Sequence, residues 1–97
     1  MDPFVRIVHN GVTYTTSLMR NGGKDVSWYE PFELLVDTAD EITFIVLDDD
    51  IVSADIVGEA TATVSSLLAQ GTDDFILPLE YRGRSAGTLT ASAWKLK

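Results

Sequence analysis

The chain has 97 residues, of which 15 are acidic and 7 basic, and it contains no cysteine. It can therefore form neither a disulfide nor a thiolate metal site, and its formal net charge of −8 disfavours nucleic acid as a partner, because phosphates would be repelled. No apolar run approaches the length of a membrane span, and the size predicts one domain over residues 1–97.

The first half of the sequence predicts four strands. Residues rich in β-branched and aromatic side chains predict a hairpin of strands over 4–8 and 12–16, joined at Asn10-Gly11. A third strand is expected over 32–36 and, after a polar turn at 37–40, a fourth over 42–47. The fourth is apolar at both parities apart from Thr43, which is typical of a strand covered on both faces.

The second half predicts three more strands and one helical turn. Residues 60–64 alternate small apolar and polar side chains, as a half-buried strand does, and 65–71 have serines to cap a helical turn and Gly71 to end it. Residues 75–79 and 88–94 are the last two strands, with Pro78 at an edge or bulge. Short strands at near-regular spacing predict an all-β fold, an antiparallel Greek-key β-sandwich of two sheets with about seven strands.

Acidic residues follow the expected strand over 42–47 directly. Asp48 and Asp50 lie two residues apart, so their side chains point to one side with Cα atoms about 6.5–7 Å apart. Asp55 can close the loop back onto the same point. Hard oxygen donors without nearby histidine or sulfur suit calcium better than magnesium or a transition metal. The spacing alone is compatible with two interpretations, a cation site and a solvated acidic turn.

Four motifs, in this order, resemble those of one family. Residues 1–5 (MDPFV) are similar to its S-D-P-Y-V, residues 25–32 (DVSWYEPF) to N-P-x-W-N-E-x-F, and residues 46–60 to V-x-D-x-D followed by D-x-[IV]-G-E-A. Residues 83–89 (GRSAGTL) resemble the last hairpin of a circular variant. Together they make the chain resemble a C2 domain, the calcium-dependent phospholipid-binding module, and especially the small modules of plants and protists.

The resemblance implies a calcium site and a cytoplasmic, peripheral membrane-binding function without catalysis. Calcium would bridge loop aspartates and lipid phosphates. Backbone carbonyls of Leu47 or Asp49 would complete the ligand shell. The carboxylates that the resemblance assigns as ligands are Asp2, Asp48, Asp50 and Asp55.

The apolar tip of the acidic loop is the expected membrane contact. Ile51 and Val52 stand where an interfacial module needs apolar side chains, although both could instead fold onto the core. The stretch 12–16 carries no charge, which disfavours phosphoinositide specificity. The interval from Asp50 to Gly58 is one residue shorter than is usual in the family, which leaves the register of Asp55 open.

The resemblance also implies that the family's first strand, with one further loop aspartate, is missing before Asp2. A protein partner, or a second copy through strand exchange, could then pair with the uncovered sheet edge. The alternative function is a calcium-independent protein-interaction or scaffold sandwich whose acids form a solvated rim.

The remaining notable residues are expected to be structural. His9 has no serine or cysteine partner for catalysis, and no small-molecule substrate is expected. The pair Arg82 and Arg84 is expected to be solvated. The residues expected to serve packing or local structure are Trp28, Trp94 and Glu59.

Overall fold

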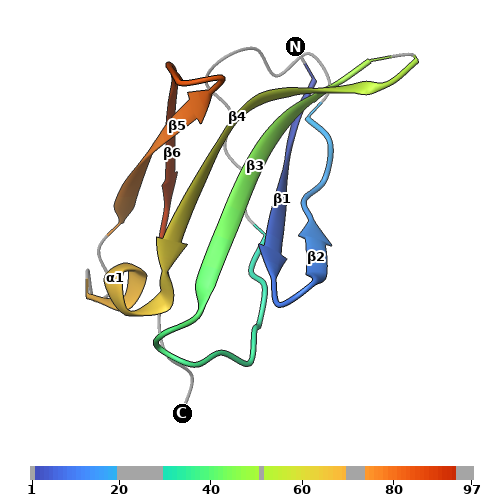
Figure 1. Ribbon diagram of the computed structural model, residues 1–97. Helices are drawn as coiled ribbons and strands as arrows, with labels where there is room; N and C mark the ends of the chain where they lie inside the picture. Colours follow the sequence, from blue (N-terminus) through green and yellow to red (C-terminus); the bar gives the residue numbers. More distant parts are fainter. Residues whose placement is uncertain (1, 20–29, 51, 70–73, 94–97) are drawn as a thin grey trace.

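The computed structural model describes residues 2–19, 30–50, 52–69 and 74–93 (Figure 1). Within these ranges the strands pair antiparallel in the order β2-β1-β3-β4-β5-β6, which confirms the all-β antiparallel class. The elements are β1 (Pro3–His9), β2 (Val12–Thr15), β3 (Glu41–Asp49), β4 (Ala54–Thr63), α1 (Val64–Leu68), β5 (Phe75–Tyr81) and β6 (Arg84–Ala91).

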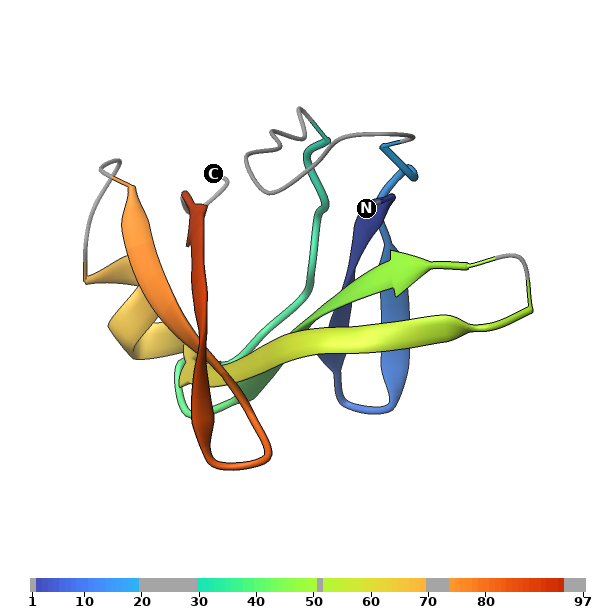
Figure 2. The same cartoon turned by 90° about the horizontal axis from the view of Figure 1, so that it is seen from above.

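The sheet curls so strongly that its two flanks face each other. Figure 2 shows the β5–β6 hairpin on one side and the β1–β2 hairpin on the other, with β3 and β4 crossing between them. The expected two sheets are therefore joined into one ladder, but β4 meets β5 through a single register pair, Glu59 with Glu80. The two layers of a sandwich are therefore present, and the β4–β5 pairing connects them at one register position.

Both hairpins turn through two residues in the left-handed region. Asn10 and Gly11 have φ values of 48° and 78°, and Arg82 and Gly83 have 52° and 75°. Positive φ at both central residues defines the turn whose twist matches that of paired strands. The Asn10-Gly11 hairpin is thus confirmed, and Pro78 lies beside a register shift in the β5–β6 pairing, as its missing N–H predicted.

Two buried clusters lie between the flanks. The upper one contains Val5, Val46 and Leu79. In the lower one the rings of Phe44 and Phe75 meet at 6.4 Å and 75°, which is the favoured edge-on geometry. The buried members of the lower cluster are Ile42, Phe44, Val64, Leu67 and Phe75.

Helix α1 closes the lower cluster. The predicted helical turn is confirmed, but its cap is Thr63 rather than a serine, because β4 runs directly into the helix. Thr63 Oγ1 accepts a hydrogen bond from the Ser66 N–H at 3.3 Å, which satisfies one of the free donors of the first turn. Val64 and Leu67 then point into the core.

One predicted strand is wrong. Residues 32–36 form no ladder, so the described part of the chain has six strands instead of about seven. The residues still alternate, with Phe32, Leu34 and Val36 half-buried and Glu33 and Leu35 exposed. Leu34 and Val36 pack against the lower cluster. The segment has the side-chain pattern of a strand but no pairing strand among the described residues. The alternating pattern alone does not show whether a neighbouring strand is available for pairing.

Candidate metal centre

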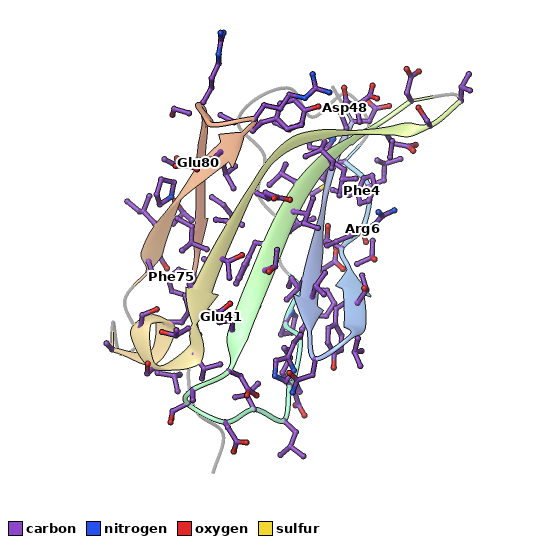
Figure 3. All side chains as sticks on the ribbon, in the orientation of Figure 1. Phe4, Arg6, Glu41, Asp48, Phe75 and Glu80 are labelled. Atoms are coloured by element: carbon purple, nitrogen blue, oxygen red, sulfur yellow. The ribbon has the colours of Figure 1, made fainter. Side chains whose placement is uncertain are left out.

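The acidic residues gather at the end of the molecule where β1 begins, β3 ends and β4 begins (Figure 1). Asp2 directly precedes β1, Asp48 is next to last in β3 and Asp55 is second in β4. The register places Asp48 opposite Pro3 on one side and opposite Asp55 on the other. Figure 3 shows Asp48 at this end. Three of the four predicted ligands therefore come from adjacent strand ends.

A β-bulge decides which carboxylates share a face. Val46 pairs with Gly58 but Leu47 pairs with Ile56, so Val57 is an extra residue on β4. Without it, the same register would set Asp55 opposite Asp49. The bulge moves Asp55 opposite Asp48, where side chains share one face with Cβ atoms about 4.5–5.5 Å apart.

Hydrogen bonds hold the backbone around this pair. The Asp2 N–H donates to Asp48 Oδ1 at 2.8 Å, and the Asp49 N–H donates to the Asp2 carbonyl at 3.0 Å. The Asp50 N–H donates to the Ser53 carbonyl at 2.8 Å and closes the turn. Asp48 is half-buried, whereas Asp49, Asp50 and Asp55 are exposed. One oxygen of Asp48, Oδ1, is thus engaged by the backbone.

The donor chemistry fits a hard cation, but the ligand shell is not complete. Carboxylates and carbonyls are the ligands of calcium, which accepts six to eight oxygens in flexible geometry. Across the described ranges, no three acidic or histidine side chains are gathered closely enough to hold an ion. Asp48 and Asp55 form a fixed pair, and the side chains of Asp2 and Asp50 would have to close around it.

The loop between β3 and β4 presents apolar surface beyond the carboxylates. Val52 is 93% exposed and Ile56, near the start of β4, is 42% exposed. Val52 therefore does not fold onto the core, and its contact with a membrane stays a prediction. Ile51 lies outside the described residues. The tip extends away from the rest of the sheet (Figure 2).

A hydrogen-bonded histidine–aspartate pair lies at the end of β1 away from the acidic loop. His9 is 5% exposed, and its Nε2 lies 2.7 Å from Asp40 Oδ2, which also accepts the Asp37 N–H at 3.0 Å. The hydrogen bond from His9 is the main cause of a lowered pKa at Asp40. The pair ties β1 to the turn before β3, which is a structural role of the kind expected for His9.

Sequence reasoning missed two features of the site. The bulge at Val57 leaves no local signal, because it exists only relative to β3. The turn at Arg82-Gly83 lies at the same end of the molecule as the acidic loop (Figure 1), and the sequence showed its charge but not its position.

Comparison with known protein families identifies one family whose model matches most of the chain. A family model described as the C2 domain matches residues 1–79, from the segment before β1 into β5. This range includes all four predicted ligands. No curated protein matches the chain. Among the described residues, no helix is long and apolar enough to cross a membrane.

Proposed function

The chain belongs to the C2 domain family, whose members bind membranes and calcium or mediate protein interactions, and on this premise we propose that it attaches peripherally to phospholipid membranes in a calcium-dependent manner. The observation that carries the proposal is the bulge at Val57, which sets Asp55 opposite Asp48. A one-residue shift that brings two like charges face to face is unfavourable unless a cation lies between them.

Four aspartates of this chain would hold calcium. Asp48 and Asp55 form the central pair, Asp2 is placed beside Asp48 by its own N–H, and Asp50 closes from the loop. Carbonyls at Leu47 or Asp49 are the proposed backbone ligands. Bound calcium would supply the positive charge that cancels these carboxylates and would offer coordination positions to lipid phosphate oxygens.

Electrostatics makes such a module switchable. With a net charge of −8, the chain is repelled by an anionic cytoplasmic leaflet until its acidic end is neutralised. Val52, exposed at the tip, and Ile51 beside it would then enter the headgroup region, and two aliphatic side chains contribute roughly 2–4 kcal/mol. Calcium thus controls the approach, and the apolar tip adds affinity.

Thermal melting and vesicle sedimentation test the proposal. We expect millimolar calcium to raise the melting temperature of the protein and to carry it into the pellet with vesicles that contain phosphatidylserine. Asp55→Asn removes the charge facing Asp48, so it should raise the melting temperature without calcium and abolish the calcium response. Asp48→Asn, which keeps an oxygen for the Asp2 N–H, should also abolish the response.

The same substitution elsewhere serves as the control. Asp74, exposed just before β5, lies at the opposite end of the sheet, so Asp74→Asn should leave the calcium response unchanged. If calcium alters neither the melting of the protein nor its sedimentation with vesicles, the proposed function is lost.

One observation favours the alternative, a calcium-independent protein-interaction module. No three acidic side chains of the described residues are pre-assembled around an ion position. This alternative predicts that Asp55→Asn stabilises the protein equally with and without calcium, because only repulsion between carboxylates is removed.

A further inference from the structure

The β5–β6 turn carries two arginines at the acidic end of the molecule. Figure 1 shows the turn at the same end of the molecule as the β3–β4 loop. Arg82 and Arg84 are both exposed. Neither forms a salt bridge within the described ranges, although the chain carries an acidic excess. Two of the seven basic residues thus stand without a salt bridge to any described residue, at the same end of the molecule as the proposed calcium loop.

The turn uses a residue that its backbone disfavours. The two hairpins have nearly the same turn conformation, yet the first has Asn10 at the left-handed position and the second has Arg82, with φ values of 48° and 52°. Asparagine and glycine adopt this region readily and arginine does not. Arginine at this position therefore has no advantage for the turn itself, which directs attention to what its side chain does.

Arg82 is held over an aromatic ring. Its guanidinium carbon lies 5.1 Å from the centre of the Tyr81 ring, and Tyr81 is 39% exposed. Stacking limits the freedom of the guanidinium, and a half-exposed tyrosine suits the boundary between water and lipid. The turn therefore presents a positioned cation beside an interfacial aromatic residue.

Close packing fixes the turn relative to β4. Gly58, near the bulge on β4, lies against Ala86 on β6 so tightly that a Cβ built on Gly58 would be 2.9 Å from that of Ala86. The hairpin therefore packs directly on β4 next to the bulge that adjoins its acidic end. A flat, negatively charged surface that meets the loop can meet the turn as well.

We propose that the turn 81–84 is a second membrane contact, in which Arg82 and Arg84 bind the phosphate and carboxylate groups of anionic phospholipids. The inference rests on the proposed function and extends it, since it names a contact that needs no calcium of its own. Guanidinium groups bind phosphate and carboxylate through paired N–H donors, and the net negative charge of an anionic headgroup, which a zwitterionic headgroup lacks, makes the contact favour anionic lipid.

Vesicle sedimentation at saturating calcium tests the inference with three single variants and one double variant. Arg82→Asn removes the charge and suits the turn, so it should raise or maintain the melting temperature while lowering affinity for phosphatidylserine-containing vesicles about fivefold. Arg84→Gln should lower it by a similar factor, and both losses should shrink at high salt. Arg6→Gln is the matched control, because Arg6 also lies over a ring, that of Phe4 at 5.5 Å, but in the middle of β1 (Figure 3).

The outcomes separate the two proposals. If the Arg82→Asn and Arg84→Gln double variant binds anionic vesicles as tightly as the wild type, the turn is not a membrane contact and the calcium function stands. An equal loss of affinity in Arg6→Gln would also overturn the inference, since net charge alone would explain the effect. If the wild type binds no vesicle even with calcium, both proposals fail together.

Discussion

Gly58 on β4 packs closely against the β5–β6 hairpin, and it offers the sharpest stability prediction. A Cβ added there would lie 2.9 Å from the Cβ of Ala86 and 3.0 Å from that of Leu79. Carbon atoms prefer separations of ~3.5–4.0 Å, so β4 and the β5–β6 hairpin must move apart to admit it. The obstacles are Cβ atoms fixed to the backbone, which cannot rotate away.

The expected effect of Gly58→Ala is the difference between two terms. Overpacking a close contact costs about 1–3 kcal/mol, whereas replacing glycine by alanine in a strand ordinarily gains about 0.5–1 kcal/mol through chain entropy. We expect a net loss of about 1–2 kcal/mol in the free energy of unfolding. For a domain of this size, each kcal/mol lowers the melting temperature by roughly 4–8 °C. Urea titration followed by circular dichroism measures the loss directly.

A second substitution isolates the contact. Ala86→Gly removes one of the two opposing Cβ atoms, so the Gly58→Ala, Ala86→Gly double variant should be more stable than the sum of the single effects predicts. A Gly58→Ala variant as stable as the wild type would refute the reasoning, since β4 and the β5–β6 hairpin would then not be in close contact at this point.

Three further predictions concern other contacts. Asp40→Asn should lower the stability of the protein at neutral pH and flatten the decline of stability in acid. The pKa of Asp40 is lowered chiefly by its hydrogen bond with His9, so the carboxylate stabilises the fold above the ordinary aspartate pKa of about 3.9, and this contribution is lost as the pH falls below that value. Melting temperatures measured across pH will show the difference between the variant and the wild type. Glu80→Lys should raise the free energy of unfolding by about 0.2–1 kcal/mol, because Glu59 and Glu80 are like charges directly opposite each other, and a gain that persists unchanged in high salt would contradict this origin. Thr63→Ala should cost about 1 kcal/mol by removing the cap of α1, with Thr63→Ser as the variant that retains it.

Local features of the fold could be predicted from the sequence where short-range chemistry decides them. Asn10-Gly11 specifies its turn by its own conformational preference, and the serine-rich stretch after β4 indicated the helix. The strand of 32–36 could not be judged in this way. Its alternating pattern is present in the structure, but a strand also needs a partner, and pairing depends on residues distant in the chain.

In the candidate site, too, some features follow from the local sequence and others depend on strand pairing. Asp48 and Asp50 were identifiable because they end a strong strand, whereas the position of Asp55 depended on a bulge. Since side chains alternate along a strand, the extra residue at Val57 shifts the pairing of residues 54–56 by one position relative to residues 58–63 and so changes which residue of β3 Asp55 faces. Nothing in the sequence from Ala54 to Gly58 marks Val57 as the extra residue, because a bulge is defined only by how the residues of β4 pair with those of β3.

The segment 32–36, which pairs with no strand among the described residues, has a consequence for the behaviour of the protein at high concentration. Its sequence, FELLV, is short, apolar and rich in strand formers, and Leu35 is 98% exposed. Such a segment is the natural starting point for edge-to-edge association between copies. Pro31, which cannot donate a backbone hydrogen bond, and Glu33, whose charge would stack against itself between molecules, act as gatekeepers that oppose it. We therefore expect substitution of Pro31 or Glu33 to promote association at high concentration while changing the folded core little.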